Sequence, residues 1–247
     1  MTQIVGFAGK KQSGKNTCCN YIYALKIAEL GISKKSRLTD SGTIEVTDIF
    51  GETVDGKEWF ELSNKNLNFE KLKADLLDQY IKIYGFADIL KDLCIDILGL
   101  TYEQTYGTDN DKNSDTSVIR PDSSETMTAR EVLQYVGTDI FRKLDPHVWI
   151  KSLLRKIDKD SPEVALICDV RFTNEVLKLQ EIGGFVVGLT RDPCEDNDSH
   201  SSEQETSESL KKCDIVIDNS EMSLQQQLSS LHSSIKHLPK VLPRMEK

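Results

Sequence analysis

Residues 4–17 read IVGFAGKKQSGKNT and combine two glycines and a lysine at a spacing that suits phosphate binding. Four residues separate Gly9 from Gly14, and Lys15 follows directly. A glycine-rich turn between a strand and a helix directs several backbone N–H groups and the positive end of the helix dipole at one place. A lysine in this position reaches the outer phosphates of a nucleotide. The stretch therefore predicts a phosphate-binding loop whose glycines let the backbone approach the ligand.

The hydroxyl that would hold magnesium stands one place later than in the general motif. The motif has serine or threonine directly after the lysine, whereas this chain has Asn16 there and Thr17 next. Nucleoside and nucleotide kinases often carry G-K-x-T, and Thr17 fits that variant, so we predict Thr17 as the metal ligand. The alternative is a glycine turn followed by a surface lysine. The strand-like run before the loop and the helical pattern after it disfavour that alternative.

A second set of charged residues follows an apolar segment in the last third of the chain. The run VALICDV, residues 164–170, reads as a buried strand that ends near Asp169, and Arg171 follows the strand. Nucleotide enzymes with a phosphate-binding loop place an acidic residue at the end of a buried strand, beside magnesium or substrate. An aspartate there can also be only a turn or a cap, but the nearby Arg171 favours a functional role. Arg130, near the start of a helix, is either a further cation of the site or an ordinary solvated arginine.

The elements that must position these residues alternate between short apolar runs and segments of helical periodicity. Strands are expected at residues 3–8, 80–86, 164–170, 185–192 and 213–219, and helices at 15–30, 87–98, 128–143, 146–159, 173–183 and 222–237. This alternation predicts an α/β fold, with a parallel sheet of about five strands and helices on both faces. Ligands of such sheets bind at the carboxyl ends of the strands.

Two polar segments interrupt this alternation. Residues 31–69 contain the alternating run TIEVTDIF and an Asp55-Gly56 turn before KEWFEL, which together predict a small β-hairpin inserted between core elements. Residues 101–127 are too polar and too long for an ordinary connection, and such loops are often lids. We therefore expect a single domain over residues 1–247, with an insertion at 31–69 and a flexible, lid-like loop at 101–127.

Composition and charge exclude several other classes of protein. The formal net charge of −9 repels nucleic acid, so binding of a polyanion over a broad surface is not expected. No apolar run approaches the roughly 18 residues of a membrane-spanning helix, and no secretory signal is visible. Six cysteines without a C-x-x-C pair, and four histidines without zinc spacing, indicate reduced thiols and no structural metal site. We expect a protein that stays in the cytoplasm.

Five segments together resemble one family, the phage-type deoxynucleoside monophosphate kinases. GKKQSGKNT resembles the family's phosphate loop, and YGFADILKDL resembles its F-A-D-P-L-K segment, with Ile89 in place of the proline. AREVLQYVGTDIFRKLDPHVWI is similar to the arginine-to-tryptophan segment, ICDVRFTNE to the D-V-R-F-x-N-E stretch, and DSHSSEQ to the D-x-H-x-S-E loop. The matches follow the family's order from residue 4 to about residue 228, which makes the resemblance much more specific than one phosphate loop.

The resemblance implies a P-loop kinase fold and transfer of the γ-phosphoryl group of ATP to a deoxynucleoside 5′-monophosphate, with magnesium. It also implies the cytoplasm of an infected cell if the chain is phage-encoded, and a homodimer is common in the family. The positions expected to contact ATP are Gly9, Lys11, Gln12, Ser13, Gly14, Lys15, Asn16 and Thr17. The positions expected around the acceptor and the transferring group are Arg130, Gln134, Gly137, Thr138, Trp149, Asp169, Arg171 and Glu175. The predicted catalytic residues among these are Lys15, Arg130, Asp169, Arg171 and Glu175.

A phosphate acceptor determines what this site must supply. Its attacking oxygen is already largely ionised at neutral pH, because the second pKa of a phosphate monoester is about 6, and no strong general base is required. The difficulty is to bring two anions together, so alignment and charge neutralisation contribute most. Lys15, Arg130 and Arg171 are the candidate cations, and arginine offers bidentate contacts to phosphate. Asp169 either fixes Arg171 or binds the sugar hydroxyl.

Four further side chains have two interpretations each. Trp149 either stacks on a base or belongs to the core. His200, in the DSHSSE stretch, either touches nucleotide or only lies in a loop. Arg120 and Arg191 are candidate lid residues or ordinary surface arginines, and a kinase needs a lid because water would otherwise hydrolyse ATP.

One departure from the family matters, and three alternative functions stay open. Relatives commonly have G-K-D-T where this chain has Gly14-Lys15-Asn16-Thr17, so an amide replaces a carboxylate. If that carboxylate helps to hold magnesium or to position the acceptor, activity would be reduced. A P-loop kinase of another phosphorylated metabolite, similar to the animal-type phosphomevalonate kinases, would lack the H-x-S-E match. A GTPase-like switch would be expected to carry N-K-x-D, whereas residues 64–67 read NKNL. The third alternative is a nucleotide-binding protein without turnover, weakened at Asn16.

Overall fold

The central element of the structure, a computed structural model, is a five-stranded sheet in which every neighbouring pair of strands is parallel. The structure describes residues 1–33, 35–39, 44–47, 59–61, 77–121, 123–191 and 201–242. The strands, in the order in which they lie across the sheet, are β10 (Ile215–Asp218), β9 (Phe185–Thr190), β1 (Gln3–Ala8), β8 (Val164–Val170) and β5 (Ile81–Tyr84). The predicted α/β sheet is therefore confirmed.

The strand order places the end of β1 at a switch point of the topology. β1 connects towards β5 on one side of the sheet, whereas its neighbour β8 connects to β9 on the other side, so the connections that follow these two adjacent strands run in opposite directions. Ala8, the last residue of β1, pairs with Val170 of β8 and with Gly188 of β9. Three strand ends therefore meet where residues 9–14 begin. Ligands of open α/β sheets bind at such a point.

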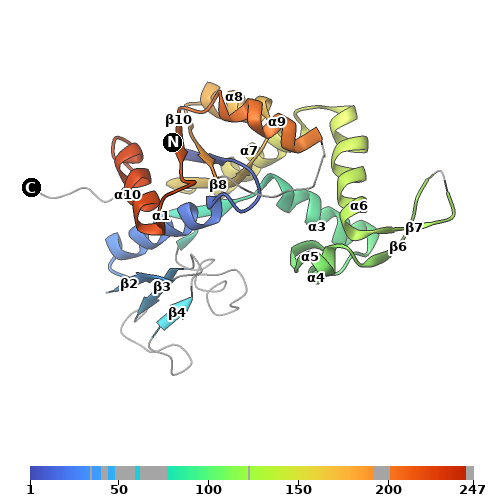
Figure 1. The fold of residues 1–247 in the computed structure, drawn as a ribbon, viewed down its shortest axis with the longest axis horizontal. Helices are drawn as coiled ribbons and strands as arrows, with labels where there is room; N and C mark the ends of the chain where they lie inside the picture. The colour runs from blue at the N-terminus through green and yellow to red at the C-terminus, as the bar shows by residue number, and fades with distance from the viewer. Residues whose placement is uncertain are drawn as a thin grey trace, which may run out of the picture. The chain divides into compact units, whose positions relative to one another are not determined.

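Helices cover both faces of the sheet because the strands are apolar on both faces. The helices of this layer arrangement are α1 (Lys15–Glu29), α8 (Thr173–Glu181), α9 (Ser201–Leu210) and α10 (Leu224–Ile235). Val5 and Phe7 are fully buried in the cluster that includes residues of α1 and α10. Gly6 faces the other way, where an added Cβ would lie 3.1 Å from Leu179 Cδ1 of α8. Figure 1 shows α1 and α10 on one side of the sheet and α8 and α9 on the other.

The insertion at residues 31–69 contains a small antiparallel sheet. Its strands are β2 (Ser36–Leu38), β3 (Ile44–Thr47) and β4 (Trp59–Glu61), in that order. β3 pairs with β4 through Val46 and Phe60, which is the hairpin that the alternating sequence predicts, and β2 adds a third strand. The predicted Asp55-Gly56 turn lies outside the described residues.

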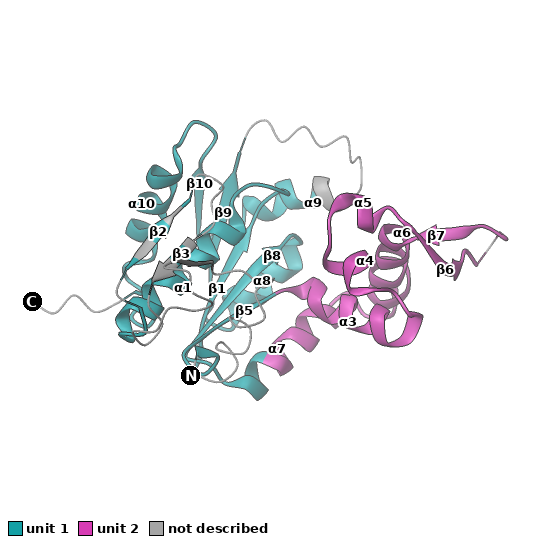
Figure 2. Cartoon of the chain, turned by 90° about the horizontal axis from the view of Figure 1, so that it is seen from below, with its two compact units in different colours: residues 1–84, 157–247 teal, residues 85–156 magenta. Residues whose placement is uncertain are grey.

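The chain divides into two compact units, and unit 2 comprises residues 85–156 (Figure 2). Unit 1 comprises residues 1–84 and 157–247 and holds the central sheet. Unit 2 is built from α3 (Phe86–Leu98), α4 (Tyr102–Tyr106), α5 (Asp109–Lys112), β6 (Asp115–Ile119), β7 (Thr126–Thr128), α6 (Ala129–Gln134), the π-helical segment η2 (Tyr135–Arg142) and most of α7 (Val148–Asp160). It has an apolar cluster of its own, which includes Cys94, Met127 and Val132. The sequence predicts one domain, whereas the structure has two compact units, and along the chain unit 2 lies between β5 and β8. No described helix combines the length and the hydropathy that crossing a bilayer requires.

Residues 101–127 contain helices and a hairpin, where their polarity predicts a structureless loop. The hydroxyl of Thr101 accepts from the Gln104 amide, and the Gln104 side chain accepts in return from the Thr101 amide. Thr108 and Asp111 form the same reciprocal pair at the start of α5. Such capping boxes stabilise short polar helices that have no apolar stripe. In the sequence, the T-x-x-Q and T-x-x-D spacings are the features that indicate the starts of these two helices.

Two helical segments differ from the sequence prediction. Helix α9 falls in an acidic, serine-rich stretch without apolar periodicity, and among residues 205–210, whose burial is described, the fully buried positions are the small polar residues Thr206 and Ser209. The predicted helix 128–143 begins with the expected Thr128–Glu131 capping box but continues beyond Gln134 in π-helical geometry.

A charged cluster joins β5 to the end of α7 within unit 1. Lys82 Nζ lies 2.9 Å from Asp78 Oδ2 and 3.0 Å from Asp160 Oδ2, and the Tyr84 hydroxyl donates to the same Asp160 oxygen at 3.0 Å. Burial lowers the pKa of Lys82, but the hydrogen bonds and charges of the two aspartates outweigh it and raise that pKa above 10.5. A raised folded-state pKa means that the stabilisation is complete below the unfolded value and is lost at higher pH.

Lys82→Met is expected to lower the free energy of unfolding by about 1–3 kcal/mol, because two half-buried carboxylates lose their shared cation. The difference should persist from pH 6 to 9, since the native pKa of Lys82 lies above that range. Urea unfolding measures it. Lys178→Met is the matched control, because Lys178 forms an exposed ion pair with Glu181 at 2.8 Å, and its loss should change stability by less than about 1 kcal/mol. Equal effects of the two substitutions would contradict a stabilising role for the cluster.

Candidate functional site

The predicted phosphate loop joins β1 to α1 and adopts a conformation that requires its glycines. The φ angles of Gly9 and Gly14 are +149° and +93°, and Gln12 between them has φ of +62°. A Cβ at Gly9 would lie 2.5 Å from the Leu189 carbonyl oxygen, and one at Gly14 would lie 2.6 Å from Gln227 Nε2. Neither position has space for a side chain. The loop therefore depends on both glycines for backbone conformation and for close packing on β9 and α10.

The start of α1 has the features of an anion site. Its N-cap is Gly14, so no side chain caps the helix, and its first turn contains no acidic residue. The helical hydrogen bonds begin with Cys18 N–H, which donates to the Gly14 carbonyl at 3.0 Å. The amide groups that precede Cys18 form the positive end of a fifteen-residue helix. This terminus fits the phosphates of a nucleotide.

Lys15 brings a buried positive charge into the loop. The residue is buried, and its Nζ donates to the Gly9 carbonyl at 2.7 Å and to the Lys10 carbonyl. Ser13 Oγ lies 3.5 Å from the same nitrogen. The ammonium thus rests on neutral oxygens of the loop itself. Charged phosphate oxygens make stronger hydrogen bonds than these carbonyls do, so a bound nucleotide can compete for the ammonium.

Asp169 and Arg171 lie at the neighbouring strand end. Asp169 is the penultimate residue of β8, and Val170 beside it pairs with Ala8 immediately before the phosphate loop. Burial raises the pKa of the Cys19 thiol well above its ordinary value, the charge of Asp169 raises it further, and the charge of Lys15 opposes both. The strand pairing therefore places the end of β8 beside the start of the phosphate loop.

Glu175 holds the turn that carries Arg171. Its carboxylate is 1% exposed, and Oε2 accepts from the backbone N–H of Arg171 at 2.9 Å and of Phe172 at 3.1 Å. The Glu175 amide donates in return to the Phe172 carbonyl at 3.0 Å. These bonds fix the backbone between the end of β8 and the start of α8, so Glu175 orients the segment from which the arginine projects.

Thr17 and Asn16 occupy the first turn of α1 with different environments. Thr17 is partly buried, whereas Asn16 is exposed. The described residues contain no group of three or more histidine, cysteine or carboxylate side chains that could hold a metal by themselves. Magnesium needs no such group beside a nucleotide, because it is held by one or two protein oxygens, phosphates and water. The Thr17 hydroxyl and the Asp169 carboxylate therefore fit such an ion.

The remaining residues predicted for the acceptor lie in unit 2. Arg130 donates from Nε to Asn113 Oδ1 at 2.9 Å and from Nη2 to Asp109 Oδ1 at 3.0 Å. Its guanidinium is thus held by α5 and the residue that follows it. Gln134 is half-buried and Thr138 is exposed. The roles of all three stay predictions.

Trp149 and Gly137 pack within unit 2. The indole is 5% exposed, its ring centroid lies 5.3 Å from that of Phe141, and its Nε1 donates to the Gly137 carbonyl at 3.0 Å. A Cβ at Gly137 would lie 2.7 Å from Leu90 Cδ2. These contacts are those of core residues, and they favour the packing interpretation of Trp149 over base stacking.

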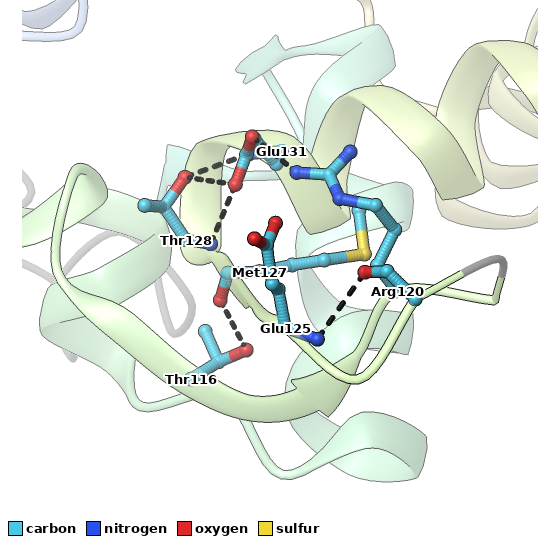
Figure 3. A network of polar contacts seen from close by, with 7 residues as sticks. Thr116, Arg120, Glu125, Met127, Thr128 and Glu131 are labelled. Carbon is cyan, nitrogen blue, oxygen red and sulfur yellow. Dashed lines mark hydrogen bonds and ion pairs between the residues drawn. The ribbon is translucent and has the colours of Figure 1, made fainter.

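Arg120, one candidate lid residue, belongs to the network shown in Figure 3. Its Nη2 lies 2.7 Å from Glu131 Oε1, while Glu131 Oε2 accepts from the Thr128 amide at 2.9 Å. The Arg120 amide also donates to the Glu125 carbonyl at 2.9 Å. This network ties the hairpin of β6 and β7 to the start of α6. Arg191 is exposed at the end of β9, and His200 lies outside the described residues.

Two polar residues near the loop were not predicted from the sequence. Asn219, after β10, and Gln227, in α10, are both fully buried behind the phosphate loop. Gln227 is the last of three consecutive glutamines in the run LQQQL, residues 224–228. The sequence does not indicate which of the three is buried. Asn219 has no local motif. Only the topology brings either residue to the loop.

Comparisons with known proteins relate the chain to one family. The family model described as deoxynucleotide monophosphate kinase matches residues 3–231. A mimivirus protein from Acanthamoeba polyphaga mimivirus, provisionally named a deoxynucleotide monophosphate kinase, is 33% identical over 151 residues, which are 55% of this chain and 73% of that protein. A deoxynucleoside-5′-monophosphate kinase of Escherichia phage T5 is 45% identical over 56 residues, which are 22% of each chain.

Proposed function

Because this chain belongs to the deoxynucleotide monophosphate kinase family, we propose that it transfers the γ-phosphoryl group of ATP to a deoxynucleoside 5′-monophosphate. The observation that carries the proposal is the meeting of two strand ends. Ala8 before the phosphate loop pairs with Val170, between Asp169 and Arg171. Cations from both segments can then face two phosphate groups at one edge of the sheet. Such charge neutralisation and alignment are the main requirements of phosphoryl transfer.

The donor side of the reaction uses the loop and the first turn of α1. We assign the β- and γ-phosphates of ATP to the loop amides and to the ammonium of Lys15, which leaves its carbonyl partners for the more strongly accepting phosphate oxygens. Magnesium would be held by the Thr17 hydroxyl, with Asp169 in its surroundings, and would neutralise charge on the β- and γ-phosphates. Gly9 and Gly14 let the backbone approach the nucleotide.

The acceptor side uses the end of β8. We assign Arg171 to the acceptor phosphate and the transferring group, because its guanidinium can bind two oxygens at once. Glu175 acts through the backbone of Arg171 and is a positioning residue in this scheme. The attacking phosphate oxygen is ionised at neutral pH, so the mechanism needs no general base. Arg130, Gln134 and Thr138 stay predicted contributors to acceptor binding.

Turnover with a panel of acceptors tests the proposal. Each of the four common deoxynucleoside monophosphates is incubated with the protein, ATP and magnesium, and ADP formation is followed with and without acceptor. Acceptor-dependent ADP formation supports the kinase. ATP hydrolysis without an acceptor would indicate a nucleotide switch, and ATP binding without turnover would indicate an inactive binding protein. Phosphomevalonate is the control acceptor for a kinase of another metabolite.

Asn16→Asp is expected to increase kcat in this assay by about tenfold or less, if a carboxylate in the first turn of α1 assists magnesium or the acceptor. Asn16 is exposed, so the substitution disturbs no packing. The new charge at the positive end of a helix should also stabilise the protein by about 0.3–1 kcal/mol. Asn20→Asp, one turn further along α1, controls for the added charge. An unchanged kcat at saturating magnesium would show that the amide replaces the carboxylate without loss.

A further inference from the structure

Two buried amide side chains connect the phosphate loop to the C-terminal part of unit 1. Asn219 Nδ2 donates to the Ser13 carbonyl at 3.0 Å and to Gln227 Oε1 at 2.8 Å. Gln227 Nε2 donates to Cys18 Sγ at 3.2 Å, behind the first turn of α1. Asn219 and Gln227 are both 0% exposed. We propose that this pair positions the phosphate loop for the donor nucleotide, an inference that rests on the proposed function of the loop.

The loop's internal hydrogen bonds shape it without fixing it to the sheet. Lys15 Nζ bonds to the Gly9 and Lys10 carbonyls, and Ser13 N–H donates to the Lys10 carbonyl at 3.3 Å. All of these groups would move together if the loop tilted. Asn219 differs because it lies outside the loop, directly after β10, and so it would not move with the loop.

Asn219 is itself anchored to the sheet. Its backbone N–H donates to the Thr190 carbonyl at the end of β9, at 2.8 Å, and its own carbonyl accepts from Met222 N–H at 3.3 Å. Its side chain therefore links the Ser13 carbonyl to the ends of β9 and β10. Gln227 adds a second connection, because its amide lies against Gly14, where a Cβ would be 2.6 Å from Nε2.

The bond to the Ser13 carbonyl sets the direction of the next amide. In a trans peptide the C=O of one residue and the N–H of the next point in opposite directions. Because the Ser13 carbonyl points at the buried Asn219, the Gly14 N–H points away from it. That N–H is one of the donors that a phosphate would use at the start of α1. A flip of this peptide would present a carbonyl dipole to an anion in place of a donor.

The assignment of the amide atoms is fixed by the network. Rotating the Asn219 amide by half a turn would place its oxygen against the Ser13 carbonyl and Gln227 Oε1, which are both acceptors. The alternative orientation is therefore excluded. Among the described residues Asn219 Oδ1 is buried without a hydrogen-bond partner. An unpaired buried oxygen is costly, which indicates that the site needs the donor end of this amide.

Asn219→Ala tests the proposal through binding, so that turnover is not required. We expect the Kd for ATP to rise by about ten- to thirtyfold, the effect of one lost hydrogen bond to an ordered loop. Inorganic tripolyphosphate, which has no base or sugar, should lose affinity by a similar factor if the loop itself is affected. Isothermal titration calorimetry measures both ligands. The KM for the monophosphate acceptor should stay within about twofold.

Leu231→Ala separates positioning from general destabilisation. Leu231 is fully buried on the same helix as Gln227, and its truncation should cost stability without removing a contact of the loop. Thermal unfolding of both variants is compared at equal nucleotide concentration. If Leu231→Ala weakens ATP binding as much as Asn219→Ala does, the effect is structural and the proposal is overturned.

Asn219→Asp supplies a second readout that a packing role would not produce. Burial raises the pKa of the introduced carboxyl, so lowering the pH converts it from an acceptor into a group that can donate to Ser13. Relative to the unaltered protein at each pH, ATP affinity should be about thirtyfold lower at pH 8 and recover several-fold at pH 6. A pH-independent ratio would contradict the requirement for a donor.

The outcomes for the two proposals can be distinguished. Weaker ATP and tripolyphosphate binding in Asn219→Ala supports the positioning role even if no acceptor is phosphorylated. Unchanged binding in that variant overturns the role while leaving the kinase proposal to the acceptor panel. If the unaltered protein binds neither ATP nor tripolyphosphate, both proposals fail.

Discussion

Replacing Arg171 by alanine is expected to lower kcat by about a thousandfold, within the range that a transition-state arginine contributes in phosphoryl transfer. Arg171 follows β8, beside the strand pair that ends at Ala8 and Val170. In the proposed mechanism its guanidinium neutralises charge between the two phosphates on the acceptor side. The Kd for ATP should change by less than about threefold, because the donor phosphates are assigned to the loop and Lys15.

Rapid-quench measurement of the chemical step, together with calorimetric titration of ATP, checks this expectation. Arg155→Ala is the matched control, since Arg155 is an exposed arginine on α7. Arg171→Lys refines the result, because lysine keeps the charge but loses the bidentate geometry. We expect Lys to recover no more than about a tenth of the activity. A kcat for Arg171→Ala within a few-fold of the unaltered protein would remove this arginine from the mechanism.

The Arg171 prediction depends on Glu175, and the sequence alone assigned Glu175 a different role. The resemblance of ICDVRFTNE to the family's D-V-R-F-x-N-E stretch implies a catalytic role for it. In the structure its Oε2 accepts from two backbone amides, those of Arg171 and Phe172. The distinction matters for experiments, because a positioning residue changes kcat through Arg171 and its effect should not add to that of Arg171→Ala.

The parts of the fold that could be predicted are those that local sequence determines. Strands β1 and β8 were predicted at residues 3–8 and 164–170, the bounds that the structure gives them. Both are buried on two faces, so they are short continuous apolar runs that end at polar or glycine residues. The phosphate loop is similarly local, since Gly9, Gly14 and Lys15 lie within one short segment. Each of the three has a steric or electrostatic role that can be recognised from that segment alone.

The parts that could not be predicted depend on contacts between distant segments. Asn219 and Ser13 are 206 positions apart, and Gln227 and Cys18 are 209 apart. No periodicity indicates that an asparagine after the last strand supports a loop near the N-terminus. Helix α9 escaped prediction for a related reason, because the buried positions in the described part of the helix are Thr206 and Ser209. Small polar residues can fill a tight interface without producing an apolar pattern.

Gly9→Ala is expected to weaken ATP binding by more than about a hundredfold and to destabilise the protein by several kcal/mol. The φ of +149° is unfavourable for alanine. The added Cβ would also lie 2.5 Å from the Leu189 carbonyl and 2.6 Å from Ser13 Oγ. The Ser13 hydroxyl can rotate away, but the Leu189 carbonyl belongs to β9, which is held between β1 and β10. The loop must therefore move instead of the sheet.

Gly31→Ala provides the control for backbone strain alone. Gly31 has φ of +67°, and an added Cβ there would meet nothing within 4 Å. This variant should lose about 1–2 kcal/mol of stability and keep its Kd for ATP, because the residue follows α1 at the end opposite the loop. Tripolyphosphate titration and urea unfolding of both variants give the comparison. If Gly9→Ala bound tripolyphosphate as Gly31→Ala does, the loop would tolerate displacement, and the requirement for close packing of Gly9 on β9 would be wrong.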